Sequence, residues 1–266
     1  MRADRKYVIL LTACVNPGAM PFTALVDTSE RLRQYREALD FYLHHTSLPI
    51  VFCENTLCDF SGDYRCYLDE GRLEYITFDG NTFDKSKGKG YGEAMIMEEA
   101  LNRSLFLAEC SFVVKVTGRL IVRNIAMLIR DNSRMLTPTI QTFYPNKGMI
   151  DSRVFIAPKE FVAVDFLMEK ERINDSYGVF FEHVLYETLL ARCSYIYIPF
   201  LKVPVIEGIS GSKGNRYKTK EANNNRFAFD MLGNALRMDK QIRSYRMPIA
   251  LKALLFLARC FLFLRK

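Results

Sequence analysis

The chain has 266 residues, of which 49% are hydrophobic and 25% are charged, and this composition excludes disorder over most of the length. The formal net charge is +7 and the isoelectric point is near 9.0. The first 200 residues are mixed in sign and the basic excess lies in about the last 70. This distribution disfavours a nucleic-acid partner and indicates an anionic surface, either a membrane or a phosphate-rich ligand.

The seven cysteines are an odd number and include no Cys-x-x-Cys pair. Several lie in apolar runs, where buried free thiols are usual, so a reducing cytoplasmic location is expected. Cys53, Cys58 and Cys66 with His44 and His45 fit no common zinc spacing. The first residues lead directly into a strand-like run, without the apolar region of a signal peptide.

Four continuous apolar runs in the first half of the chain predict buried strands. They are Tyr7–Thr12, Pro49–Cys53, Leu73–Phe78 and Phe112–Val116, with helices expected over about residues 28–43 and 92–108. Thr28 or Ser29 can cap the first helix. Because apolar strands that alternate with helices form a sheet covered on both faces, we expect an α/β fold with a mostly parallel central sheet flanked by helices.

Polar residues follow these strands at the points where the strands end. They are Thr12, Glu54, Asn55, Asp79, Thr117 and Arg119. The carboxyl ends of parallel strands share one edge of a sheet, and ligands bind there. The sequence therefore predicts one site at this edge.

The second half is less regular. A helix and then a loop are expected over residues 120–150, strands at Arg153–Ala157 and Phe161–Val164, a helix at about Val179–Arg192 and a strand-like run from Tyr195. Residues 209–225 are polar, basic and glycine-bearing, which predicts a mobile loop.

The C-terminal segment, residues 246–266, is almost wholly apolar apart from widely spaced cations. Lys252, Arg259 and Lys266 are seven apart and would form one stripe of an amphipathic helix. We expect this helix to lie in the interface of a membrane, with its cations at lipid phosphates. A helix packed in a core or an oligomer, and a spanning helix, are the alternatives.

The segment Lys87-Gly-Lys-Gly-Tyr-Gly-Glu93 combines three glycines with two lysines just before a helix. Glycines let a backbone approach a ligand closely, and the N–H groups that begin a helix attract anions. The spacing is neither a Walker A motif nor a Rossmann fingerprint. A phosphate-binding loop is predicted, and a solvated lysine turn is the alternative.

The segment Lys115-Val-Thr-Gly-Arg119 closes the fourth strand. A lysine inside an apolar strand is costly without a partner, and a phosphate or carboxylate of a ligand would satisfy it. An internal salt bridge is the alternative.

Taken together, several stretches resemble GT-A-type bacterial glycosyltransferases of the kind encoded with lipopolysaccharide O-antigen and capsule genes. They are Arg31–Tyr35, Ile50–Asn55, Lys87–Glu93 and Lys115–Arg119 followed by Asn124, within residues 7–125. The resemblance implies a Rossmann-like nucleotide-sugar domain over residues 1–245, with a donor-binding half to about residue 125 and an acceptor half beyond it. It also implies a nucleotide-sugar donor, a lipid-linked or lipopolysaccharide saccharide acceptor, and a place on the inner face of the cytoplasmic membrane.

The resemblance also implies a set of donor-binding residues at the sheet edge. They are Thr12, Ala13, Asn16, Glu54, Asn55, Lys87, Gly88, Lys89, Gly90, Tyr91, Lys115, Thr117, Gly118 and Arg119. The segment Gly208–Tyr217 is expected to close over the donor phosphates as a lid that excludes water, through Ser212, Lys213, Arg216 and Tyr217.

One feature departs from the family. GT-A enzymes commonly carry an Asp-x-Asp motif that binds a divalent cation near the end of the strand after the donor-binding helix, and Lys115–Arg119 occupies that place. Arg and Lys can stabilise a leaving diphosphate without a metal. We therefore expect no cofactor and an enzyme that is independent of, or only weakly dependent on, Mn²⁺ or Mg²⁺.

Direct displacement on a sugar needs a general base for the acceptor hydroxyl. The resemblance favours Glu182, early in the helix at about Val179–Arg192, with His183 and Glu187 beside it and Asp175 as the alternative. The alternative for Glu182 is a structural role, in which a carboxylate in the first turn interacts favourably with the helix dipole.

Two other functions are compatible with the same residues. One is a non-catalytic protein that binds a membrane surface or a polyanion. The other, a nucleotidyltransferase, normally needs carboxylates that hold Mg²⁺, and no paired-aspartate motif is present at the expected place.

Overall fold

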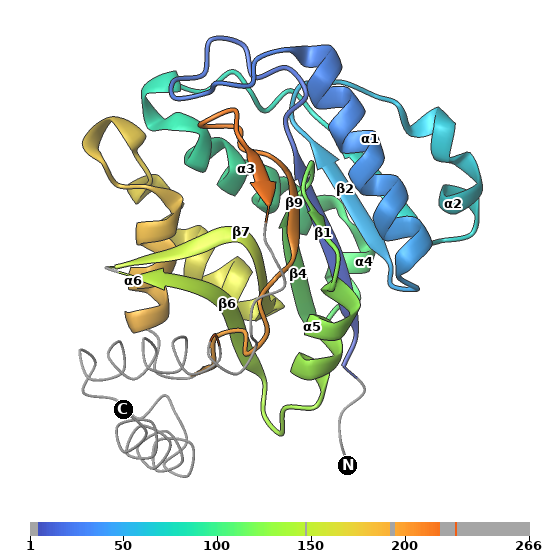
Figure 1. The fold of residues 1–266 in the computed structure, drawn as a ribbon, viewed down its shortest axis with the longest axis vertical. Helices are drawn as coiled ribbons and strands as arrows, with labels where there is room; N and C mark the ends of the chain where they lie inside the picture. Colours follow the sequence, from blue (N-terminus) through green and yellow to red (C-terminus); the bar gives the residue numbers. More distant parts are fainter. Residues whose placement is uncertain (1–4, 147, 192–194, 219–226, 228–266) are drawn as a thin grey trace.

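The computed structural model describes residues 5–146, 148–191, 195–218 and 227 (Figure 1). Its centre is a seven-stranded sheet. In sheet order the strands are β3 (Leu73–Thr77), β2 (Ile50–Glu54), β1 (Tyr7–Ala13), β4 (Phe112–Thr117), β7 (Met149–Pro158), β6 (Thr139–Asn146) and β8 (Ile196–Tyr197). The first four are parallel, β7 runs antiparallel to both of its neighbours, and β8 is parallel to β6. The predicted α/β fold with a mostly parallel sheet is confirmed.

Helices cover both faces of the sheet. The helices α1 (Thr28–His45) and α5 (Ile125–Ser133) pack on one face, and α3 (Gly88–Arg103), α4 (Leu105–Glu109) and α6 (Phe181–Ala191) on the other, while the short α2 (Arg65–Asp69) precedes β3. Successive strand residues point to opposite faces of the sheet. Ile9 and Leu11 therefore lie in the core on the side of α1, and Val8 and Leu10 in the core on the side of α3. This is why β1 is buried along its whole length.

The cap of α1 differs by one residue from the prediction. Asp27, rather than Thr28 or Ser29, caps the helix, because its side chain accepts a hydrogen bond from the Glu30 N–H at 3.0 Å.

The second half corrects three sequence predictions. The expected loop before residue 150 contains β6, whose buried Gln141 and Thr142 hide the strand alternation. The run from Phe161 is a π-helix (Phe161–Phe166) and not a strand. In a strand Val164 and Phe166 would share one face, but Phe166 is buried and Val164 is exposed.

The third correction concerns the predicted mobile loop. Its described part forms a hairpin of β9 (Ile206–Ile209) and β10 (Arg216–Lys218), which pairs with β5 (Ile121–Val122) as a second sheet of three strands. The hairpin lies in front of the central sheet in Figure 1.

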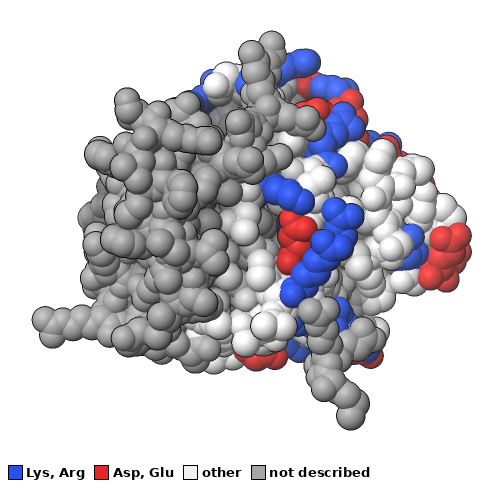
Figure 2. All heavy atoms as spheres, turned by 60° about the horizontal axis from the view of Figure 1, so that its bottom comes forward, with Lys and Arg blue, Asp and Glu red and all other residues white. Residues whose placement is uncertain are grey.

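Charges on the described surface are mixed in sign. Figure 2 shows Lys and Arg beside Asp and Glu on the described part of one face. Among the described residues, no helix has both the length and the apolar character needed to cross a bilayer. The predicted interfacial helix at residues 246–266 and the domain boundary before it lie outside the described residues.

Candidate functional site

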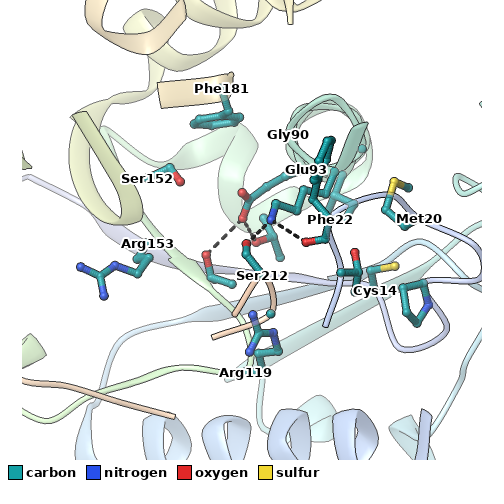
Figure 3. Close-up of a pocket in the computed structure, with 18 of the residues that line it drawn as sticks. Cys14, Met20, Phe22, Gly90, Glu93, Arg119, Ser152, Arg153, Phe181 and Ser212 are labelled. Carbon is teal, nitrogen blue, oxygen red and sulfur yellow. Dashed lines mark hydrogen bonds between the residues drawn. The ribbon is translucent and has the colours of Figure 1, made fainter. Parts of the chain in front are cut away.

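A cavity of about 790 Å³ lies at the edge of the sheet where β1 and β4 end, the edge that the sequence predicts (Figure 3). Side chains reach it from β1, β4 and β7, from α1 and α3, from the start of α6 and from the turn between β9 and β10. Met20, Phe22 and Phe181 are among the apolar residues that share the lining with polar and charged groups. The cavity thus combines charged and apolar groups from distant parts of the sequence.

The structure brings together many of the residues that the sequence predicts. Those that line the cavity are Thr12, Ala13, Asn55, Lys89, Gly90, Thr117, Arg119, Asp175, Glu182, Ser212, Lys213 and Tyr217. The predicted residues that do not line it are Asn16, Glu54, Lys87, Gly88, Tyr91, Lys115, Gly118, His183 and Arg216.

Four side chains, Thr12, Glu93, Lys115 and Thr117, form a hydrogen-bonded group beside the cavity, the Glu93 cluster. The three strand residues point to the α3 face of the sheet, where Glu93 meets them. The Lys115 side chain is 0% exposed, and its Nζ lies 2.6 Å from Glu93 Oε1 and 2.6 Å from the Ser152 carbonyl oxygen. The hydroxyls of Thr12 and Thr117 donate to the same Glu93 oxygen at 2.8 and 3.2 Å.

This cluster fixes Glu93 in its ionised form. Burial would raise the pKa of Glu93, but the charge of Lys115 and the hydrogen bonds from Lys115, Thr12 and Thr117 outweigh burial and hold that pKa below its usual range. Lys115 therefore has an internal carboxylate partner. The structure corrects the prediction that Lys115 awaits a ligand phosphate, in favour of the internal salt bridge.

Glu182, near the start of α6, is a second carboxylate of the cavity. Its Oε1 accepts a hydrogen bond from Ser152 Oγ at 2.6 Å. Burial raises the pKa of Glu182 above its usual value of 4.5, the Ser152 hydrogen bond opposes this in part, and the nearby charge of Glu93 raises it further. Two neighbouring carboxyls with pKa values shifted in opposite directions are the arrangement from which acid and base roles are built.

Asp175 binds the N-terminus of α3. Burial raises the pKa of Asp175, and the charge of Lys89 and the backbone N–H groups of Lys89 and Gly90 oppose that rise. The helix already begins at Gly88, whose φ of +83° and lack of a side chain leave room for Asp175; a Cβ there would lie 2.1 Å from Asp175 Oδ2. The glycine-rich segment is thus the first turn of α3 and not a loop, and the Asp175 side chain lies against Gly88 at its start.

Three cations, Arg31, Lys89 and Arg119, surround the cavity without carboxylate partners and form the cationic cluster. Arg31, which is 6% exposed, donates to the carbonyls of Cys14 and Leu25 at 2.9 and 3.1 Å. Arg119 donates to the Ile209 carbonyl, and Lys89 to the Ser212 hydroxyl and the carbonyl of Phe22. In the part of the chain that the structure describes, none of the three forms an ion pair.

The charges of the cationic cluster oppose one another. Burial lowers the pKa of Arg119, and the nearby charge of Arg31 acts in the same direction. Burial also lowers the pKa of Lys89. Neutral carbonyl and hydroxyl partners satisfy the N–H groups. Carboxylates of the cavity act on Lys89 and Arg119 from a distance, but none forms an ion pair with the cationic cluster among the described residues, so an anion in the cavity would be stabilised.

The β9–β10 hairpin closes one side of the cavity, as the predicted lid would. The Gly211 carbonyl accepts a hydrogen bond from the Ala24 N–H at 2.8 Å, and the Ser212 hydroxyl contacts Lys89. Gly211 also lies against Arg119: a Cβ at this position would be 2.5 Å from its Nη2. Of the predicted lid residues, Arg216 on β10 alone is not part of the lining.

Three predicted donor-binding residues hold loops together instead of lining the cavity. Glu54 is fully buried and accepts hydrogen bonds from the backbone N–H groups of Val15 and Cys58, both at 2.9 Å. Asn16 accepts from the backbone N–H two residues on at 3.1 Å, and Gly118 donates its N–H to the end of β1 at 2.8 Å. These contacts shape the edge of the sheet.

Three more have partners elsewhere. Lys87 pairs with Glu171, which also accepts a hydrogen bond from the Tyr91 hydroxyl at 2.8 Å. His183 Nδ1 accepts from the Phe180 N–H at 3.1 Å, which caps the start of α6. The geometry therefore gives His183 a structural contact and leaves Glu182 as the candidate base.

No sequence pattern assigns a role of their own to Glu93, Arg31 or Ser152. Helical spacing could have found the first, because Glu93 lies four residues after Lys89 and shares its face. Ser152 carries no local signal, since its contact with Glu182 depends on how β7 packs against α6.

The donor set does not fit a divalent cation. Among the described residues, no three His, Cys, Asp or Glu side chains gather as a metal site requires. Two of the carboxylates that line the cavity pair with cations of the chain: Glu93 with Lys115, and Asp151 with Arg153. Hard cations take several free oxygen ligands, so carboxylates in such pairs are poor ligands for them.

No protein-family model and no curated protein matches the sequence. Solved structures with a loose likeness include a glycosyltransferase involved in the glycosylation of the major capsid of PBCV-1 (TM-score 0.41, 11% identity, 73% of this chain and 80% of that chain). Core-mannan synthase A from Aspergillus fumigatus, in an Mn/GDP form, has a TM-score of 0.43 and 10% identity over 84% of this chain and 81% of that chain.

A further structure, 4-diphosphocytidyl-2C-methyl-D-erythritol synthase from Anaerococcus prevotii, has a TM-score of 0.40 and 12% identity, with 84% of this chain and 96% of that chain covered. Likeness at this level assigns neither a family nor an activity.

Proposed function

We propose that this protein is a glycosyltransferase that moves a sugar from a nucleotide-sugar donor to a saccharide acceptor, lipid-linked or part of a lipopolysaccharide or capsule. The observation that carries the proposal is that one cavity joins the unpaired cationic cluster to two carboxylates with opposite pKa shifts. A nucleotide-sugar has the matching chemistry, because its diphosphate is anionic and its sugar is a neutral polyol. The resemblance of residues 7–125 to GT-A-type enzymes points the same way.

In this proposal Arg119 and Lys89 bind the diphosphate, supported by Arg31. The nucleoside lies toward Asn55, which is 2% exposed and whose Oδ1 has no hydrogen-bond partner among the described residues. Asn55 Nδ2 donates to the Gly80 carbonyl at 3.4 Å, and this contact fixes the amide so that Oδ1 stays an acceptor. An N–H or O–H of the nucleoside would satisfy it.

Glu182 serves as the general base. The acceptor oxygen forms a bond to the anomeric carbon, the bond from that carbon to the diphosphate oxygen breaks, and Glu182 takes the hydroxyl proton. The raised pKa of Glu182 makes it a better proton acceptor than an ordinary carboxylate. The positive charges of Arg119 and Lys89 stabilise the leaving nucleoside diphosphate, in the place of a metal ion.

A membrane location belongs to the same proposal. Residues 246–266 have the composition of an interfacial helix, and a lipid-linked acceptor would be reached from the cytoplasmic face of the inner membrane. Co-sedimentation of the full chain with vesicles tests this: binding to anionic but not to zwitterionic vesicles is expected, and no binding to either contradicts it.

Titration calorimetry tests the central claim. Wild-type protein is expected to bind UDP or GDP saturably, and Arg119→Ala to lose this binding. Arg123→Ala is the matched control, because Arg123 pairs with Glu207 at 2.7 Å on the surface. Polyanions that bind equally well to wild type and Arg119→Ala, with no saturable nucleotide binding, would instead favour a non-catalytic polyanion-binding protein.

A further inference from the structure

The carboxylate of Glu93 uses its two oxygens differently. Lys115, Thr12 and Thr117 all contact Oε1, at 2.6, 2.8 and 3.2 Å. No hydrogen bond or ion pair joins Oε2 to another group among the described residues, and Glu93 lines the cavity with its side chain 19% exposed. One oxygen is thus held by the protein while the other is available to a ligand.

The electrostatics select the kind of group that Oε2 would bind. Glu93 is ionised, so it can only accept hydrogen bonds. The charge of Lys115 neutralises that of Glu93, so the pair has no net charge with which to attract a cation. Neutral donors fit this environment best, and hydroxyl groups are the neutral donors that a nucleotide-sugar carries in greatest number.

Glu93 also has the right place. It lines the same cavity as Arg119 and Glu182, and its charge acts on both of them. In the view of Figure 3, Glu93 reaches into the cavity from α3 and Arg119 from the opposite side, with Ser212 between them. In a bound nucleotide-sugar, the sugar follows the diphosphate and adjoins the base.

We infer that Glu93 is the sugar-binding residue of the cavity: Oε2 accepts hydrogen bonds from hydroxyl groups of the transferred sugar, while Lys115, Thr12 and Thr117 hold Oε1. This inference rests on the proposed function, and it adds a residue that selects the sugar. Lys115 is then a positioning residue, since it acts through Glu93 and does not touch the ligand.

Calorimetric titration of Glu93→Gln with UDP, GDP, UDP-glucose, UDP-N-acetylglucosamine and GDP-mannose tests the inference. In this variant the amide oxygen must face Lys115 and both threonines, so a donor N–H₂ replaces the acceptor at Oε2. The affinity for the nucleotide-sugar that the wild type binds is expected to fall about tenfold or more, and that for the matching nucleoside diphosphate to change less than about twofold.

Two further variants serve as controls for folding and for specificity. Glu93→Gln combined with Lys115→Met removes both buried charges and is expected to give the same selective loss, even where Glu93→Gln alone unfolds. Glu98→Gln is the matched control, because Glu98 lies on the same helix but pairs with Lys170 at 2.8 Å, outside the cavity.

The outcomes separate the two proposals. Equal losses for nucleotide-sugar and nucleoside diphosphate, or no loss for either, would overturn the role of Glu93 and leave the proposed function standing. A wild-type protein that binds none of the five compounds would overturn the proposed function and the sugar-binding role together.

Discussion

The Glu93 cluster and the cationic cluster adjoin one cavity, yet in the described part of the chain only the cation of the Glu93 cluster forms an ion pair with a carboxylate of the chain. Lys115 is completely buried and has a carboxylate partner at 2.6 Å, whereas Arg31, Lys89 and Arg119 have only neutral partners among the described residues. A cation near a cavity is therefore not by itself a ligand site. What distinguishes the two clusters is whether a carboxylate of the chain forms an ion pair with the cation.

The largest expected effect is on stability, in Lys115→Met. The substitution leaves Glu93 without its cation beside an apolar interior, which should lower the free energy of unfolding by about 3–5 kcal/mol. Urea denaturation at pH 7 measures it. Lys202→Met is the control, since Lys202 pairs with Asp131 at 3.1 Å near the surface and should change stability by less than about 1 kcal/mol. A similarly small loss in Lys115→Met would remove the distinction between the clusters.

In the cationic cluster the effect should fall on activity instead. Arg119→Met is expected to lower kcat/KM for sugar transfer by about 10²–10³, because the leaving diphosphate loses a charge partner. Stability should stay equal or rise, since a buried charge without an ion-pair partner is removed. Transfer assays and urea denaturation of the same preparation measure both, with Arg123→Met as control. Parallel losses of activity and stability would mean that Arg119 is a structural residue.

A smaller effect concerns pH. A carboxyl with a raised pKa in the folded protein stabilises the fold below its usual value of 4.5, and this contribution is lost as the pH rises through the folded pKa. Glu182→Gln should therefore gain stability relative to wild type at pH 7 but not at pH 4.

Glu93 should behave in the opposite way. Its lowered pKa contributes stability above the usual value, and that contribution is lost as the pH falls through the folded pKa. Denaturation of wild type, Glu182→Gln and Glu93→Gln at both pH values checks the two signs, and equal signs would contradict the opposite pKa shifts.

The smallest expected effect is that of chelation. If the cationic cluster stabilises the diphosphate, EDTA should change the transfer rate by less than about twofold. Complete loss of activity, restored by Mn²⁺ or Mg²⁺, would show that a metal ion, and not these side chains, stabilises the diphosphate.

The sheet was predictable where burial is continuous. The strands β1, β2 and β4 are buried along nearly their whole length, and sequence and structure agree on them and on the partly buried β3 to within a residue. β6 was not predictable, because Gln141 and Thr142 are polar yet buried: Gln141 accepts from Asn132 in α5, and Thr142 contacts the distant Tyr197. The short apolar run from Phe161 has no period that separates a helix from a strand.

The location of the site was predictable, but its charge pairing was not. Strand ends placed Thr12, Thr117 and Arg119 at one edge. Whether Lys115 meets a ligand or Glu93, and whether Asp175 acts on a substrate or on the amides of α3, depends on contacts between residues far apart in sequence. A sequence gives the residue types, whereas pairing follows from packing.

Gly211 shows how a residue without a functional group can set the position of one that has it. An added Cβ would come within 2.5 Å of Arg119 Nη2, which is the far end of a flexible side chain and can move away at little cost to the fold. A methyl group here would therefore redirect the guanidinium of Arg119 without removing any polar group from the cavity. Positions 119 and 211 should consequently vary together among related chains, as a steric pair rather than a chemical one.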